Sequence, residues 1–114
     1  MDINGKLCEA ANNGDLEGVR KALDRGADVH ALNDYALRLA AEYGHLEVVE
    51  LLLDRGADIY KALENKANVF SFIRKLDLTT NAKEALLIQA ISHSHDDVIV
   101  YLMGEADGHQ RKTI

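Results

Sequence analysis

The sequence predicts an all-α fold, a solenoid of about four stacked helix pairs in which the third pair is degenerate. The first observation is that the string "DRGAD" occurs at residues 24–28 and again, 30 positions further along, at residues 54–58. The second is that another copy of the surrounding pattern follows after a shift of 50 positions instead of 30. Internal repeats with a period of about 20 to 50 residues are the signature of solenoids, in which each unit stacks only on its neighbours.

Each copy is predicted to form two short helices, and the second copy shows this most clearly. Apolar residues recur at three- and four-residue steps in both of its helices: Leu37, Ala40 and Ala41 in the first, and Leu46, Val49 and Leu53 in the second. This spacing places them on one face of each helix. Gly44 and Gly56 follow the two helices, where glycine supplies the positive φ that ends a helix. Asn81 and Ser94 each precede an acidic residue by three positions and are predicted to cap later helices.

The first copy has polar or small residues at positions where the second copy has large apolar ones. Glu9, Gly18, Lys21 and Ala22 stand where the second copy has Leu39, Val48, Leu51 and Leu52. A terminal unit of a stacked array has one face in water, so these replacements indicate a cap. The predicted divisions of this single domain are a capping repeat over 1–30, a full repeat over 31–60, a degenerate repeat over 61–80, a last repeat over 81–108 and a tail over 109–114.

The degenerate segment is too short for a full helix pair, yet it contains both phenylalanines of the chain. Helical spacing places four of its residues on one face, namely Val69, Phe72, Ile73 and Leu76. We expect this face to pack between the second and the last repeat, and Phe70 to point elsewhere.

The last repeat has Val100 and Tyr101 where the second has Glu50 and Leu51. Its outward stripe is therefore more apolar than a capping unit requires. We expect this end to be covered, either by residues 105–114 or by a second molecule.

The segment over residues 36–59, "ALRLAAEYGHLEVVELLLDRGADI", resembles an ankyrin repeat. The family's helix-opening Thr-Pro-Leu-His is represented by Tyr35-Ala36-Leu37-Arg38, so only the leucine is retained. The period of 30 residues is shorter than the family's usual ~33. Short repeats without proline resemble those of large DNA viruses and some intracellular bacteria. The resemblance covers residues 7–60 and, less closely, residues 83–103.

The resemblance implies a binding surface formed by the loop tips and the exposed positions of the first helices. Carried over by position, it comprises His30, Leu32, Asn33, Tyr35, Arg38, Glu42, Tyr43, Tyr60 and Lys61. Tyrosine and arginine are residue types that binding hot spots favour. We therefore expect a non-enzymatic module without cofactor that acts as an inhibitor or adaptor of another folded protein. The sequence of the repeats suggests, by resemblance, a viral, phage or bacterial effector directed at a host protein.

Composition and charge argue against other classes of function. The formal net charge of −6 opposes a nucleic-acid binder, whose affinity rests on clustered lysine and arginine. The sequence has no run of about 18 apolar residues that would predict a membrane span. The N-terminus lacks the apolar core of a signal peptide. The single cysteine, Cys8, cannot form an internal disulfide, so we expect a cytoplasmic protein.

Two alternative functions remain open at this point. One is a small metal-binding protein centred on His93 and His95, because the run of residues 93–97 combines two histidines with two carboxylates. The same run also fits the turn between two helices. Cys8, at the expected exposed counterpart of Arg38, lies in no catalytic motif, and nothing supports an enzyme. The other alternative is a self-assembling, dimeric scaffold that associates through Phe70, Val100 and Tyr101.

Overall fold

The computed structural model describes residues 2–63 and 66–106, and these residues form helices and turns without a strand. The helices are α1 (Ile3–Asn13), α2 (Leu16–Asp24), α3 (Ala31–Glu42), α4 (Leu46–Asp54), α5 (Ile59–Ala62), α6 (Lys66–Ile73), α7 (Thr80–Ser92) and α8 (Asp96–Ala106). The predicted all-α class and the stacked array are confirmed.

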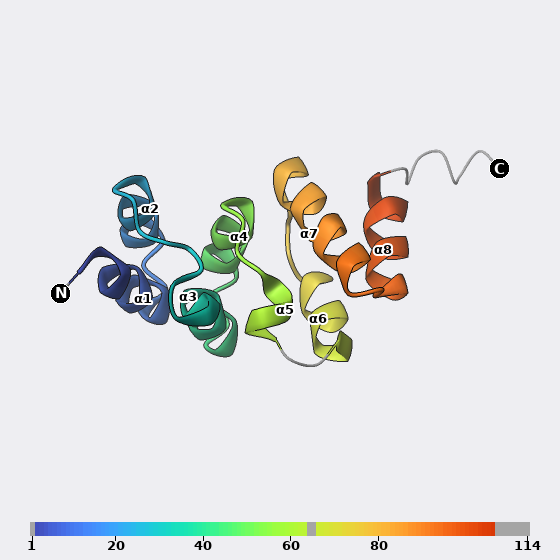
Figure 1. Cartoon of the computed structure of the whole chain (residues 1–114). Coiled ribbons are helices and arrows are strands. Elements are labelled where there is room, and N and C mark those ends of the chain that lie inside the picture. The colour runs from blue at the N-terminus through green and yellow to red at the C-terminus, as the bar shows by residue number, and fades with distance from the viewer. Residues whose placement is uncertain (1, 64–65, 107–114) are drawn as a thin grey trace.

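The helices stack in two rows along an elongated array (Figure 1). The inner row contains α1, α3 and α5, in which α3 contacts both of the others. The outer row contains α2, α4 and α7, in which α4 contacts both of the others. The last helix, α8, packs against α7. The inner helix α3 is therefore placed against the inner helices of both neighbouring units.

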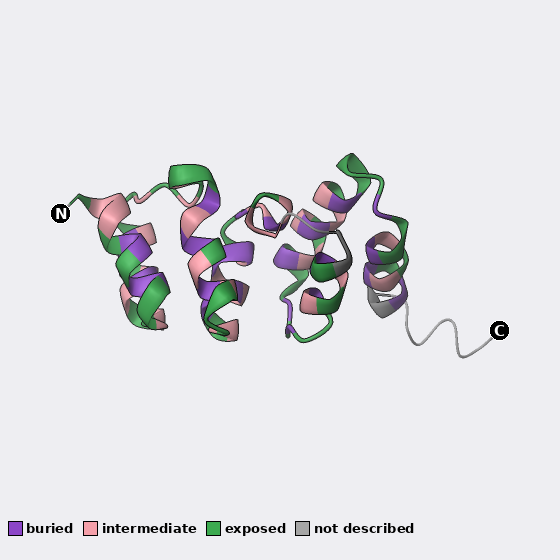
Figure 2. Ribbon diagram, turned by 90° about the horizontal axis from the view of Figure 1, so that it is seen from below, coloured by how far each residue is buried: buried purple, intermediate pink, exposed green. Residues whose placement is uncertain are grey.

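The predicted apolar stripes form the core between the two rows. Leu37 and Val49 are 1% and 0% exposed, and their counterparts in the first copy, Leu7 and Val19, are both 0% exposed. Figure 2 shows the buried positions on the faces that the helices turn toward one another. The repeated spacing in the sequence is thus the cause of the repeated packing, because each unit buries its stripe against the next.

Glycine is required at one point where the second repeat packs tightly against the first. Gly14 ends α1 in the left-handed region, with a φ of 71°. The ring of His45 lies over it, and a Cβ at Gly14 would come within 2.6 Å of His45 Nδ1. From this position His45 Nε2–H donates a hydrogen bond to the carbonyl oxygen of Asn12 at 3.1 Å. This bond ties the second repeat to the first.

The start of α3 differs from an ordinary helix start. Leu32, Asn33 and Asp34 have φ values of 55°, 60° and 60°, so they form a left-handed turn before the right-handed helix continues. Asparagine and aspartate tolerate this region, whereas an aliphatic residue such as leucine is strained there. The turn is held by Asp34, which is 0% exposed and anchors it to Asp58, in the loop that precedes α5.

Two predicted helix caps are wrong. The cap of α7 is Thr79, whose Oγ1 accepts the backbone N–H of Ala82 at 3.0 Å. Asn81 instead donates its side-chain N–H to the carbonyl oxygen of Asp54 at 2.6 Å. Ser94 has a φ of 52° and takes the place that Gly44 has in the second copy. The prediction for Asn81 fails because its side chain bonds to the end of α4, and the prediction for Ser94 fails because this residue adopts the left-handed conformation of the turn before α8.

The degenerate segment packs largely as its spacing predicts. Val69 and Ile73 of α6 are both 0% exposed and Leu76 is 8% exposed, whereas Phe72 is only partly buried. Phe70 points elsewhere and meets the ring of Tyr101 edge-on, with the ring centroids 6.0 Å apart. This contact joins α6 to α8.

Candidate functional site

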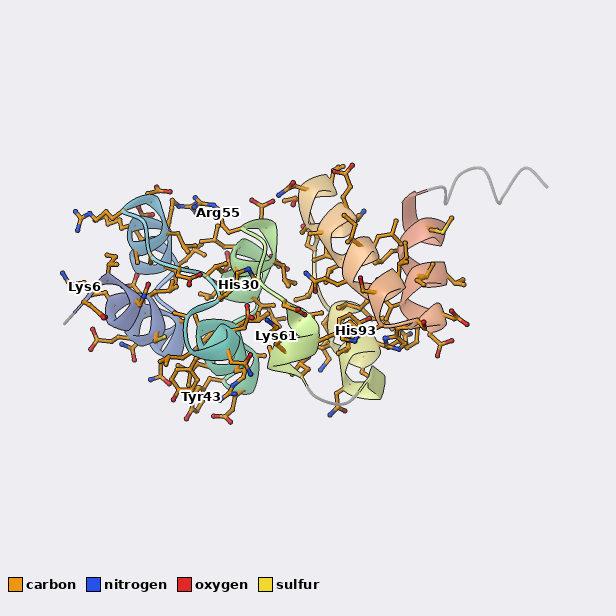
Figure 3. All side chains as sticks on the ribbon, viewed as in Figure 1. Lys6, His30, Tyr43, Arg55, Lys61 and His93 are labelled. Carbon is orange, nitrogen blue, oxygen red and sulfur yellow. The ribbon has the colours of Figure 1, made fainter. Side chains whose placement is uncertain are left out.

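The predicted partner-binding residues lie on α3, immediately beside its two ends and on α5, and we call them the α3 surface. Leu32 is 74% exposed and Tyr43 is 57% exposed. His30, Asn33, Arg38, Glu42 and Lys61 are also exposed, while Tyr35 and Tyr60 are half-buried. Figure 3 shows Tyr43 projecting from the lower end of α3, with His30 and Lys61 nearer the middle of the array. The surface therefore runs along the inner row of helices.

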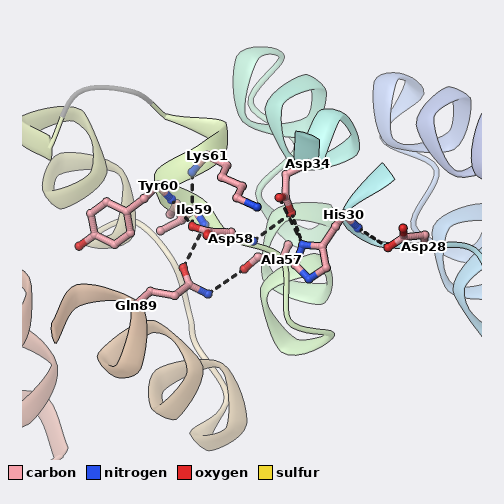
Figure 4. Close-up of polar contacts among 9 residues, drawn as sticks. All are labelled: Asp28, His30, Asp34, Ala57, Asp58, Ile59, Tyr60, Lys61 and Gln89. Atoms are coloured by element: carbon pink, nitrogen blue, oxygen red, sulfur yellow. Dashed lines mark hydrogen bonds and ion pairs between the residues drawn. The ribbon is translucent and has the colours of Figure 1, made fainter. Parts of the chain in front are cut away.

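A network of hydrogen bonds fixes the turn that begins this surface (Figure 4). His30 Nδ1–H donates to Asp34 Oδ1 at 3.0 Å, and the same oxygen accepts the backbone N–H of Asp58 at 3.0 Å. The backbone N–H of His30 donates to Asp28 Oδ1 at 2.9 Å. Because both ends of the turn are anchored, Leu32 is held outward on an ordered backbone.

Arg38 is supported from within the chain. Its guanidinium carbon lies 5.2 Å from the centroid of the Tyr35 ring, within the range of a cation–π contact. None of the described carboxylates forms an ion pair with Arg38. The side chain is thus positioned on the surface before any partner arrives, which lowers the entropic cost of binding.

Tyr60 has a different environment from the other predicted contact residues. Its hydroxyl is hydrogen-bonded to His95 Nδ1 at 2.9 Å, and its ring stacks on His93 with centroids 4.2 Å apart and an interplanar angle of 17°. Tyr60 therefore joins α5 to the turn between α7 and α8. Because His93 covers one face of the Tyr60 ring, a smaller area of this side chain can contact a partner.

The phenol of Tyr60 is expected to be difficult to ionise. Burial disfavours the phenolate, and the negative charge of Asp58 adds to this, so the pKa of Tyr60 rises to about 12. Its ordinary pKa is about 10, so the stabilising contribution is fully present below that pH and is lost as the pH rises from there through 12. In an absorbance titration of the phenolates, Tyr60→Phe should remove the step at highest pH. If that step persists in the variant, the assignment to Tyr60 is wrong.

Gln89 is a structural residue of this site that the sequence did not indicate. Its Oε1 accepts the backbone N–H of Ile59 at 3.1 Å, and its side-chain N–H donates to the carbonyl oxygen of Ala57 at 3.0 Å. Both polar groups of one α7 side chain thereby hold the loop that precedes α5 (Figure 4). Gln89 lies about 30 positions from this loop in the sequence, and no sequence motif around it predicts the contact.

The geometry gives little support to the metal and nucleophile interpretations. Within residues 2–63 and 66–106, no group of three or more histidine, cysteine, aspartate or glutamate residues is arranged to hold a metal ion. The expectation that Cys8 is exposed is wrong, because α1 buries it to 9% exposure against its neighbours. Burial and, to a lesser extent, the charge of Asp2 raise the pKa of its thiol, which disfavours the reactive thiolate.

The predicted self-association residues lie at the far end of the array. Val100 is 64% exposed on α8, whereas Phe70 and Tyr101 are half-buried and contact each other. Three further large apolar residues are exposed on α7 and α8, namely Ile88, Ile91 and Met103. Val100 and these three residues, which we call the apolar patch of α7 and α8, differ from the predicted set.

Stacked helix pairs with an exposed, pre-ordered inner row define a helical-repeat scaffold of the kind that binds other proteins. The family model for ankyrin repeats in three copies matches residues 7–112, so the chain belongs to the ankyrin repeat family. Ankyrin repeats are generally non-enzymatic modules of protein–protein interaction. No curated protein and no solved structure matches the chain. Across the described parts of the chain, no helix has the length and apolar character needed to cross a membrane.

Proposed function

We propose that this chain is an inhibitor or adaptor in the cytoplasm that binds another folded protein through the α3 surface. The observation that carries the proposal is the ordered turn of residues 30–34, which presents an exposed leucine beside Tyr35 and Arg38. The sequence of the repeats supports an effector directed at a host protein. Such a chain acts by occupying, masking or bridging its target.

The residues of the α3 surface have the physical properties of binding anchors. Tyrosine and arginine bury a large area at low entropic cost and are enriched among hot spots. Tyr43 is more than half exposed, so it can lose much of its accessible surface on binding without a rearrangement of the fold. Truncation of an exposed side chain that makes few contacts within the fold tests partner binding without a large change in stability.

Alanine at Tyr35, Arg38 or Tyr43 should weaken partner binding, and at the exposed Arg38 and Tyr43 it should leave the melting temperature within a few degrees of the parent chain. A hot spot among them should cost about 2 kcal/mol or more of binding free energy. Affinity capture from the source cell, followed by mass spectrometry and titration of the captured protein, measures the effect. Glu47→Ala on α4 is the matched control, because Glu47 is exposed in the outer row. Partner capture at parental strength by all three variants would contradict the assignment of the α3 surface.

A second candidate function, self-association into a dimeric scaffold, is favoured by the apolar patch on α7 and α8. Four exposed large apolar residues on the last two helices are an unusual feature for a capped solenoid. In this interpretation Val100 contacts a second molecule. The ring contact between Phe70 and Tyr101 holds the helix of Val100, α8, against α6.

Sedimentation equilibrium of the intact chain and of Val100→Glu tests self-association. A dimer is expected for the intact chain and a monomer for the variant, because a carboxylate at position 100 would have to be buried unpaired in the interface. The control is Lys21→Glu, which also introduces a carboxylate but lies on α2, in the first repeat and away from the patch. It should leave the dimer intact. A monomeric intact chain would exclude this function.

A further inference from the structure

The inner row of helices is interrupted after α3. The inner helices α1 and α3 have 11 and 12 residues, whereas α5, which follows them in the row, has only 4. In Figure 2, α5 accordingly lies beside only one end of α3. The remaining length of α3 faces a position that a longer inner helix would fill.

The first repeat shows how this position is normally covered. Cys8 and Ala11 of α1 are the counterparts, 30 positions earlier, of Arg38 and Ala41 of α3. Cys8 is 9% exposed and Ala11 is 0% exposed, because α3 packs against α1. Arg38 is exposed and Ala41 is only partly buried. Among the residues that the structure describes, the same strip of helix surface is therefore covered in the first repeat and not in the second.

A groove of about 610 Å³ lies at this uncovered strip. Ala41 of α3, Leu63 after α5 and Phe72 of α6 supply apolar lining. Arg38, Glu42 and Asn68 supply polar lining. A groove with an apolar lining beside charged residues is suited to an amphipathic segment.

The charges at the groove specify what such a segment must carry. Arg38 and Glu42 are four positions apart and so lie one helical turn from each other on the same side of α3. Neither forms an ion pair with a described residue, and they do not pair with each other. A helical ligand that lies along α3 would pair with Arg38 and Glu42 if it carried a carboxylate and a cationic group one turn apart.

We propose that the groove between α3 and α6 binds an amphipathic helical segment of the partner protein, in the position of the missing part of the inner helix. The segment places an aliphatic side chain against Ala41, Leu63 and Phe72. Its carboxylate pairs with Arg38, and its lysine or arginine pairs with Glu42. This assignment rests on the proposed function, since it identifies the part of the partner that the α3 surface recognises.

The test uses a displayed library of helix-stabilised peptides, three turns long, selected on the whole chain. Peptides that also bind Ala41→Trp, in which the new side chain fills the groove, are removed by counter-selection. Circular dichroism confirms that this variant is folded. Arg38→Glu serves as the second variant because an exposed position tolerates the change. Arg25→Glu, at an exposed arginine that follows α2, is the matched control.

The selected peptides should share an acidic and a basic residue one turn apart beside an aliphatic residue. Arg38→Glu should weaken their binding by about tenfold, and lysine in place of the peptide's acidic residue should restore it. Arg25→Glu should bind like the parent chain. The proposal is overturned if no helical peptide survives counter-selection, or if the survivors bind Arg38→Glu and the parent equally. Partner capture that depends on Tyr43 but not on Ala41 would overturn the groove alone and leave the proposed function standing.

Discussion

Replacing Leu37 by alanine is expected to lower the free energy of unfolding by about 2–5 kcal/mol, the usual cost of truncating a buried leucine. Leu37 is 1% exposed and lies in the core between the two rows, where it has a counterpart in Leu7. Truncation removes apolar contact and leaves a cavity that the stacked neighbours cannot close without shifting. Because a whole domain has only about 5–15 kcal/mol of net stability, this loss removes a large share of it. Equilibrium denaturation followed by circular dichroism measures the loss.

Leu32→Ala is the matched control for this prediction. The same side chain is truncated, but Leu32 is 74% exposed, so its loss should change stability by about 0.5 kcal/mol or less. An unchanged denaturation curve for Leu37→Ala would show that the repeat register is incorrect.

Asp34→Ala is expected to cost about 2–3 kcal/mol of stability, because hydrogen bonds to a charged acceptor are among the stronger ones. The buried carboxylate accepts from the backbone of Asp58 and from the ring of His30. Without it, a partly buried N–H loses its partner and the left-handed turn loses its anchor. Hydrogen exchange at Asp58 and the denaturation midpoint both report the change.

Asn4→Ala provides the comparison for Asp34→Ala. Asn4 is the counterpart of Asp34 in the first copy, and its Oδ1 accepts the backbone N–H of Asp28 at 2.7 Å. This bond is neutral and exposed, so its removal should cost less. An equal or larger loss for Asn4→Ala would contradict the role assigned to the buried carboxylate.

The stacked fold could be predicted because it follows from local periodicity. Leu37, Val49 and their counterparts recur at fixed offsets, and helical spacing places them on one face without knowledge of any distant contact. The burial of Val69 and Ile73 in the degenerate segment follows from the same rule. Repetition thus makes the core predictable from the sequence alone.

The details of the binding surface could not be predicted in the same way. The left-handed turn at Asp34 depends on a hydrogen bond to Asp58, which lies 24 positions further along the chain. The packing of Tyr60 on His93 depends on how the last repeat closes against α5. The groove arises because α5 is shorter than α3, the inner helix that it packs against. These features arise from contacts between residues that are distant in the sequence, which the spacing of apolar residues within a helix does not encode.

The most direct test of the α3 surface is photo-crosslinking in the source cell with a photoreactive phenylalanine analogue in place of Tyr43. The same analogue at Glu47, exposed on the outer-row helix α4, is the control. If the α3 surface is the binding surface, one protein should be crosslinked efficiently from position 43 and not from position 47. Crosslinking of the partner from position 47, with none from position 43, would contradict this assignment.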